Sequence, residues 1–374
     1  MMTGERDKYV DGLRVLSVAS IVFGHWFSAT ASWDPGRVWV GNILSSIPLF
    51  WPASWVFMAV PVVLFVGGFS NFVALSRYGN GSRGYRGFYV RRLRRLLRPV
   101  MFFLGFWLIV EFMAHLLSVG GDHLVRLVYT GGAGPFGPLW FIIVYLAAVI
   151  MSPGLVWLHR RYRIAIPAAL AAGCVGVDLL RFVGHVPLVG WLNLALAWLL
   201  PHQLGFFYAD GSFSRASRRL LASMCVAGLL SLVVGSSTGA YSPTIGYVRG
   251  LGPSNINPPT AMILMLSIWQ VGLVLLCRRW ITAALGVPRV EYSVVKLNGV
   301  IMSVYLWHMT ALLLVLLMLL PIGLANSEPP LSGWWYQRPI WLVLGVAVLA
   351  VIIKLVAWVE RGEGKGDWVF SMVD

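Results

Sequence analysis

The sequence predicts an all-α protein, a polytopic membrane helical bundle of about ten transmembrane helices with both termini in the cytoplasm. Of its 374 residues, 58% are hydrophobic and only 11% are charged, and the mean hydropathy is +0.77. Apolar stretches long enough to cross a hydrocarbon core of roughly 30 Å follow one another along the chain. The cationic residues gather in alternate gaps between these stretches, as they do in multi-pass membrane proteins.

The apolar stretches account for nearly the whole chain, so we expect residues 1–374 to form a single membrane-embedded domain. A spanning helix needs about 20 predominantly apolar residues. The predicted spans are 12–32, 53–76, 99–118, 138–158, 164–181, 188–209, 219–237, 259–277, 297–320 and 338–359.

The distribution of cations fixes the expected orientation. If the N-terminus is cytoplasmic, each outer gap that carries a cation holds a single arginine, namely Arg37, Arg126, Arg249 or Arg338. The inner gaps hold Arg77, Arg83, Arg86, Arg91, Arg92, Arg94, Arg95, Arg98, Arg160, Arg161, Arg163, Arg215, Arg218, Arg219, Arg278, Arg279, Arg289 and Lys296. This asymmetry predicts that both termini lie inside.

The charge and the cysteines exclude other classes. A formal net charge of +15 would suggest a nucleic-acid partner in a soluble protein. Here the topology accounts for the cations, so we expect the lipid bilayer as a partner and no nucleic acid. Cys174, Cys225 and Cys277 have no ligand-like spacing, so neither a metal site nor a disulfide framework is predicted.

Between the spans, three outer segments are rich in Gly, Pro, Ser and Asn and are expected to be irregular: 131–138, 241–259 and 321–333. The inner segment 278–296 is expected to form a short helix on the membrane surface, with Trp280, Ile281 and Leu285 facing lipid.

The first span carries Arg14 near its start and His25 past its middle, with ten residues between them. At about 1.5 Å of rise per residue they lie roughly 16 Å apart, so an arginine at the cytoplasmic edge places the imidazole near mid-membrane. An ionisable group at that depth faces a protein interior or a wet cavity. A neutral imidazole suits proton abstraction from a hydroxyl, so His25 is the candidate general base. The alternative for Arg14 is an edge cation that reaches the headgroups.

The second inner loop, 88–99, holds more arginines than orientation requires. On a helix, its i and i+3 pairs would form a stripe of guanidinium groups, which match phosphate oxygens bidentately. The candidate residues for binding a phosphorylated cytosolic donor are Arg91, Arg92, Arg95 and Arg98. The alternative is a topogenic loop that touches anionic lipid headgroups.

Other polar residues within the spans have two interpretations each. His308 should reach the depth of His25 and share its cavity, or else bond between helices. Glu111 and His115 lie one turn apart and either orient His25 or pair structurally. Asp178 and Arg181 form a local ion pair or part of an acceptor pocket.

Five groups of residues together resemble the acyltransferase 3 family of integral membrane O-acyltransferases over nearly the whole chain. They are Asp11-Gly12-Leu13-Arg14 followed by His25, Phe65-Val66-Gly67-Gly68-Phe69, the loop from Phe88 to Pro99, Leu139-Trp140-Phe141, and Tyr305-Leu306-Trp307-His308. The chain departs from the family in two places. Gly67 stands where Ser is common, and one extra residue precedes Pro99.

The resemblance implies transfer of a short acyl group, with acetyl expected, from acyl-CoA to a hydroxyl of a carbohydrate, envelope glycolipid or secondary metabolite. It implies acyl-CoA as co-substrate, no resident cofactor, and a bacterial inner membrane as the location. The family's paired Arg and His fall on Arg14 and His25, its loop arginines fall on Arg92 and Arg95, and Trp140 takes a pocket role.

Three other functions remain open from the residues alone. The protein could carry an acyl group across the membrane to a partner enzyme. Its intramembrane ionisable groups could instead form the relay of a proton-coupled transporter. A structural subunit of an envelope complex would explain the hydrophobicity but not the combination of arginines and histidines.

Overall fold

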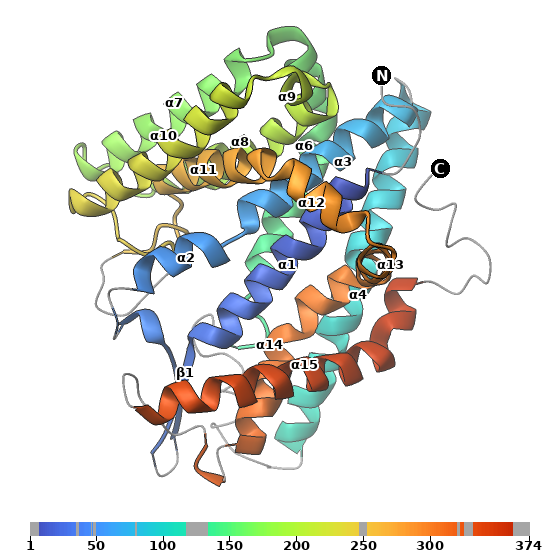
Figure 1. Ribbon diagram of the computed structural model, residues 1–374, viewed down its shortest axis with the longest axis vertical. Coiled ribbons are helices and arrows are strands. Elements are labelled where there is room, and N and C mark those ends of the chain that lie inside the picture. The colour runs from blue at the N-terminus through green and yellow to red at the C-terminus, as the bar shows by residue number, and fades with distance from the viewer. Residues whose placement is uncertain are drawn as a thin grey trace.

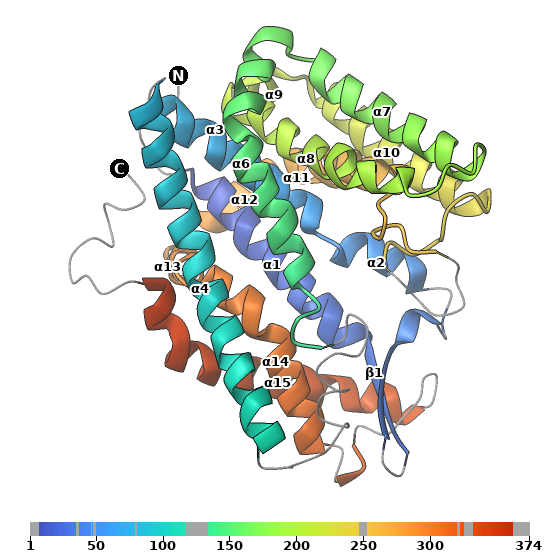
Figure 2. The same ribbon diagram turned by 180° about the vertical axis from the view of Figure 1, so that it is seen from behind.

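The computed structural model describes residues 7–34, 37–45, 47, 50–78, 81–116, 134–246, 253–319, 322–324 and 332–361. These residues form a bundle of long helices (Figures 1 and 2), which confirms the predicted all-α membrane class. In the first half of the chain the helices are α1 (Lys8–Ser28), α2 (Trp51–Phe57), α3 (Val60–Tyr78), α4 (Ser82–Leu116), α6 (Leu139–Tyr162) and α7 (Ala165–Phe182).

The second half contributes α8 (Asn193–Ala209), α9 (Ser212–Arg215), α10 (Arg218–Ser237), α11 (Ala261–Leu276), α12 (Arg278–Leu285), α13 (Pro288–Asn298), α14 (Ile301–Leu319) and α15 (Ser332–Arg361). Two 3-10 turns, η1 (Ile43–Ser45) and η3 (Val189–Leu192), precede α2 and α8.

Each of the ten predicted spans contains a helix, but fewer are long enough to cross a bilayer alone. Within the described residues, eight helices have sufficient length and hydropathy, and α11 with α12 makes a ninth if this pair, bent by 54°, is counted as one span. The helices α8 and α11 contain only 17 and 16 residues. This count of eight to nine among the described residues is consistent with the predicted polytopic bundle of about ten helices.

The helices differ in how much of their surface is enclosed by protein. In α14 and α1, 72% and 61% of the most apolar window is buried, whereas in α7 and α10 the value is 22%. Hydrophobicity does not separate the two groups, because lipid tails are as apolar as a protein core. Asp11 and Ser17 of α1 and Ser303, His308 and Thr310 of α14 lie in the interior of the bundle.

Glycines allow α3 and α8 to touch backbone to backbone. A Cβ added to Gly68 would lie 1.9 Å from the carbonyl oxygen of His202, and one added to Gly205 would lie 2.2 Å from that of Phe65. Gly67 similarly faces the ring of Tyr145 on α6, at 2.5 Å from Cε2 to the added Cβ. The motif Phe65-Val66-Gly67-Gly68-Phe69 is thus a packing surface, of the small-residue kind common between membrane helices.

Two outer segments differ from their expected form. The first span ends at Ser28, and the chain continues as a hairpin of strands β1 (Ala29–Asp34) and β2 (Arg37–Asn42), paired antiparallel. Gly134, Pro135 and Pro138 are buried, so the end of the expected outer loop folds into the bundle. The Tyr305 hydroxyl donates to the carbonyl of Pro138 at 2.8 Å and fixes this loop against α14.

The inner ends of α1, α14 and α15 meet at one end of the bundle. Glu360 of α15 accepts hydrogen bonds from the backbone N–H groups of Met302 and Ser303, at 3.1 and 2.8 Å, and so caps α14. Asn298, just before α14, donates to the carbonyl of Asp11 in the first turn of α1 at 3.1 Å. The described ends of the chain therefore lie on the same side.

The close contacts of Gly68 predict that one added methyl group at this position lowers the stability of the protein strongly. Gly68→Ala should lower the thermal unfolding temperature in detergent strongly, because over-packing costs about 1–3 kcal/mol even where side chains can rotate away, and here the obstacle is a backbone carbonyl. Gly105→Ala in α4 is the matched control, since nothing lies within 4 Å of its added Cβ. Equal unfolding temperatures for the two variants would contradict the described packing of α3 on α8.

Candidate functional site

The site is built around two histidines that the fold brings into contact. Nδ1 of His25 on α1 lies 2.7 Å from Nε2 of His308 on α14, and the two rings are nearly parallel, with 6° between their planes. His308 is completely buried, whereas His25 is partly exposed. The partly exposed ring is therefore the one that a substrate can reach.

The hydrogen bonds determine which nitrogen of each neutral ring carries its proton. Nδ1 of His308 lies 2.5 Å from the carbonyl oxygen of Tyr305, and because a carbonyl can only accept, this nitrogen is the donor. Nε2 of a neutral His308 then accepts, so Nδ1 of His25 donates to it. The lone pair of His25 is thereby left on Nε2, as proton abstraction requires.

Three further hydrogen bonds hold the end of α1 that carries His25. The indole N–H of Trp26 donates to the carbonyl of His308 at 2.9 Å. Arg338 of α15 donates to the carbonyls of Ala29 and Trp26, at 2.7 and 3.4 Å. Its guanidinium lies between the rings of Trp334 and Trp341, 4.4 and 3.8 Å from their centroids, and only 3% of the residue is exposed. Arg338 thus satisfies carbonyls that the helix end leaves without partners.

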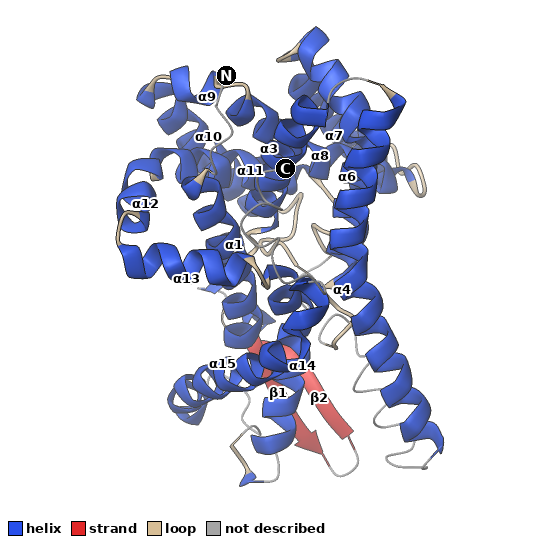
Figure 3. Ribbon diagram, turned by 90° about the vertical axis from the view of Figure 1, so that its right-hand side faces the viewer, coloured by secondary structure: helices blue, strands red, loops and turns tan. Residues whose placement is uncertain are grey.

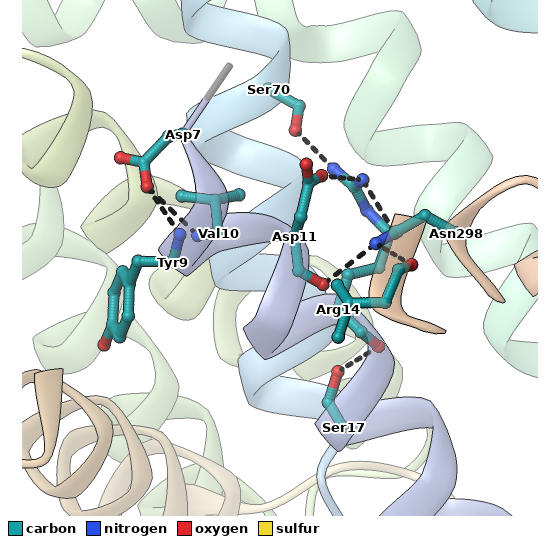
Figure 4. Close-up of polar contacts among 9 residues, drawn as sticks. Asp7, Tyr9, Val10, Asp11, Arg14, Ser17, Ser70 and Asn298 are labelled. Atoms are coloured by element: carbon teal, nitrogen blue, oxygen red, sulfur yellow. Dashed lines mark hydrogen bonds and ion pairs between the residues drawn. The ribbon is translucent and has the colours of Figure 1, made fainter. Parts of the chain in front are cut away.

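Arg14 is held by groups from three helices (Figure 4). Its Nη1 donates to Asp11 at 3.0 Å and to the side-chain oxygen of Asn298 at 3.2 Å, and its Nη2 donates to the hydroxyl of Ser70 at 3.1 Å. Asp11 is buried and Arg14 is partly exposed. The guanidinium is therefore held in one orientation by Asp11, Asn298 and Ser70, and its role toward an anion stays a prediction.

The loop arginines lie within the first half of α4, and two of them lie near Arg14. Arg92 donates to the carbonyl of Ser70 at 2.5 Å, so Ser70 bonds both Arg14 and Arg92. Arg95 is close enough to Arg92, Asp11 and Glu360 to interact with their charges. The stripe predicted on α4 and the arginine predicted on α1 thus form one cationic cluster, to which Arg14, Arg92 and Arg95 contribute.

The other two candidates of the loop are placed less centrally. Arg91 is exposed and Arg98 is partly buried. Their proposed contact with a donor stays a prediction, since no contact to Arg14 is described for either side chain.

Trp140 lies beside the segment that supports the histidine pair. Its ring packs on Trp198, with 5.4 Å between centroids, and the next residue, Phe141, contacts Tyr305 at 5.4 Å. Tyr305 in turn supplies the carbonyl that binds His308. The two family motifs that carry Trp140 and His308 are therefore in contact, although a direct role of Trp140 in a pocket stays a prediction.

Asp178 and Arg181 hold the outer ends of α7, α8 and α11 together. Asp178 accepts from the Tyr241 hydroxyl, the Asn193 amide and the backbone N–H of Ala261, at 2.9, 2.9 and 2.7 Å. Arg181 donates to the carbonyl of Pro258 at 3.3 Å. These bonds give both residues a structural role, and contact with an acceptor stays a prediction.

Glu111 and His115 lie near the outer end of α4. Trp107, one turn before Glu111, donates to the hydroxyl of Thr310 on α14 at 3.3 Å, which places Glu111 outward of His308. The partner that orients His25 in the structure is His308, so an orienting role for Glu111 stays a prediction.

Several residues of the site were not identified from the sequence. Ser70, Asn298 and Arg338 contact Arg14 or the end of α1, but they lie on helices distant in sequence. For His308 the sequence offered a cavity shared with His25 or a bond between helices, and in the structure its imidazole bonds that of His25 between α14 and α1. Within the part of the chain that the structure describes, His, Cys, Asp and Glu side chains form no group of three that could hold a metal ion.

This geometry defines a multi-pass membrane protein in which a hydrogen-bonded imidazole pair lies near one end of α1 and a cationic cluster near its other end. A family model described as an acyltransferase domain, that of acyltransferase 3, matches residues 7–359. The chain therefore belongs to the acyltransferase 3 family and is a membrane acyltransferase. Comparison with curated proteins and with solved structures returned no match.

The contacts of Arg338 predict its contribution to stability. Arg338→Met keeps much of the apolar stem but leaves the carbonyls of Trp26 and Ala29 without their donor, at a cost of about 1–3 kcal/mol for each buried polar group. Thermal unfolding of the purified protein should therefore begin at a clearly lower temperature. Tyr336→Phe is the control on the same helix, because Tyr336 is 81% exposed. Unchanged stability of Arg338→Met would show that the bonds to α1 are not formed.

Proposed function

We propose that the protein transfers a short acyl group, with acetyl expected, from acyl-CoA to a hydroxyl of a carbohydrate, an envelope glycolipid or a secondary metabolite. The observation that carries this proposal is the hydrogen-bonded pair of His25 and His308, which leaves a lone pair on Nε2 of His25. A hydroxyl is a weak nucleophile until a base removes its proton, and a correctly oriented imidazole supplies that base.

In the proposed reaction, Nε2 of His25 takes the proton of the acceptor hydroxyl as its oxygen attacks the thioester carbon. The C–S bond then breaks, CoA leaves as a thiolate, and the proton on His25 neutralises it. While His25 is protonated, the positive charge is stabilised through its Nδ1–H bond to Nε2 of His308. Tyr305 keeps His308 in the tautomer that can accept this bond.

The cationic cluster supports acyl-CoA as the donor. Arg14 and Arg92 are both fixed by Ser70 near the inner end of α1, and Arg95 lies beside them. Guanidinium groups at this level suit the phosphates of CoA. The pantetheine arm would then extend along α1, across the roughly 16 Å of helix that ten intervening residues provide, toward His25. Positioning of the two reactants would supply a large share of the rate enhancement.

The second candidate function is a transmembrane acyl carrier that delivers the group to a partner enzyme. The placement of the cationic cluster and the histidine pair at different depths of α1 favours this alternative as much as direct transfer. The first experiment distinguishes the two, because only an enzyme transfers the acyl group without a partner.

That experiment is acyl transfer by the purified, detergent-solubilised protein from radiolabelled acetyl-CoA to a lipid and glycan extract of the host. His25→Ala should lower kcat by about 10²–10⁴-fold, the usual contribution of a general base. His308→Ala should also lower kcat, because His25 loses its orientation, whereas His308→Gln should retain part of the activity, since its amide oxygen can accept from Nδ1 of His25. Normal transfer by His25→Ala would exclude it as the base, and saturable CoA binding without transfer by the wild type would favour the carrier.

The cationic cluster is tested by steady-state kinetics with varied donor. Arg92→Ala combined with Arg95→Ala should raise the KM for acetyl-CoA about tenfold or more, because each charged hydrogen bond contributes roughly 1.5–3 kcal/mol, and should change the KM for the acceptor little. Arg83→Ala with Arg86→Ala is the matched control, since both arginines are exposed on the first turns of the same helix. An unchanged donor KM in the first variant would remove these arginines from the donor site.

A further inference from the structure

A groove on the cytoplasmic side of the bundle lies between the start of α1 and the helices α12 and α13. Figure 3 shows these two helices at the side of the bundle next to α1. The groove has a volume of about 350 Å³ and an almost entirely apolar lining. This volume is typical of pockets that hold small ligands. It is lined by Gly12, Val15, Leu16, Trp280, Ile281, Ala284, Leu285, Val290 and Val294.

The groove opens to the outside of the protein at the level of the inner leaflet. Leu16 and Trp280 are each 54% exposed and Val290 is 40% exposed, while Leu285 at the floor is buried against Gly12. The sequence predicted that this segment lies on the membrane surface with Leu285 facing lipid. In the structure the segment forms two short helices in place of one, α12 and α13, and Leu285 is turned toward Gly12 of α1, which creates the groove.

The charges next to the groove are suited to a phosphate. Arg279 is exposed and its guanidinium lies 4.6 Å from the centroid of the Trp280 ring, and Arg289, beside Val290, is also exposed. Glu291, the carboxylate of α13, is paired with Lys8 at 2.7 Å and so does not oppose an anion. Basic residues at the inner membrane surface favour anionic lipids by about 1 kcal/mol each.

We propose that this groove binds an acyl chain of an anionic phospholipid of the cytoplasmic leaflet, whose phosphate is held by Arg279 and Arg289. The apolar lining excludes a free phosphate or a sugar as the principal ligand, because neither has apolar surface whose burial against the lining would favour binding. A zwitterionic phospholipid would fill the groove equally well but would lack the net charge that the two arginines favour.

The groove shares its walls with the residues that hold Arg14. Asn298 donates to the carbonyl of Val294, a lining residue, and accepts from Arg14, which lies between the lining residues Gly12 and Val15 on α1. A bound chain would hold α13 against α1 and keep Arg14 in place for the donor. This consequence for catalysis rests on the proposed function, whereas lipid binding does not.

The test measures lipid binding through Trp280 in nanodiscs, without acyl-CoA. Phosphatidylglycerol and phosphatidylcholine with brominated chains are compared as quenchers, and the signal of Trp280 is the difference between the wild type and Trp280→Phe. Brominated phosphatidylglycerol should quench Trp280 at a roughly tenfold lower mole fraction than brominated phosphatidylcholine, given two cations at the site. Arg279→Gln combined with Arg289→Gln should remove this preference.

A pair of matched variants tests the groove itself. Ala284→Phe fills the groove and should prevent quenching, whereas Ala283→Phe, at the neighbouring exposed position that does not line it, should leave quenching unchanged. Equal quenching by both lipids would overturn the proposal in favour of ordinary boundary lipid. Absence of quenching by either lipid would overturn the proposal, because it would show that another part of the chain covers the groove. Because no acyl donor is present, these outcomes are independent of the proposed acyl transfer.

Discussion

The contact between His25 and His308 is the interaction on which the organisation of the membrane interior depends. Two neutral imidazoles in an apolar bundle must satisfy their N–H groups within the protein, because lipid offers no partner. His25 donates a hydrogen bond to His308, and His308 donates one to the carbonyl of Tyr305. These bonds form only if α1 and α14 are adjacent with the two histidines at the same level. Trp26 adds a second bond between the two helices.

The cationic cluster must overcome the repulsion between its own charges. Guanidinium groups repel one another, so bringing Arg14, Arg92 and Arg95 together requires acceptors between them. Ser70 accepts from the first two, and Asp11 and Glu360 provide negative charge nearby. The cluster retains a net positive charge at the inner end of α1, while the imidazole pair lies deeper. The proposed donor, a negatively charged molecule with a long arm, fits both features.

Other polar groups of the bundle hold helices together. Asp178 joins three helices at the outer side, and Arg338 joins α15 to the end of α1. Both are buried, and each is bonded to backbone or side-chain groups that would otherwise lack partners. Gly68 and Gly205 also hold helices together. They lack side chains, so α3 and α8 approach so closely that their backbone atoms touch.

The sequence alone determined the membrane class, the approximate positions of the spans and the common depth of His25 and His308, because hydropathy and helical rise are local properties. It could not determine that α8 and α11 contain only 17 and 16 residues, or that residues 29–34 and 37–42 pair as strands, since these depend on where helices end. Only the tertiary structure decided which residues hold Arg14 and α1. Ser70, Asn298 and Arg338 are unremarkable in the sequence, and their roles arise because helices far apart in the chain pack side by side.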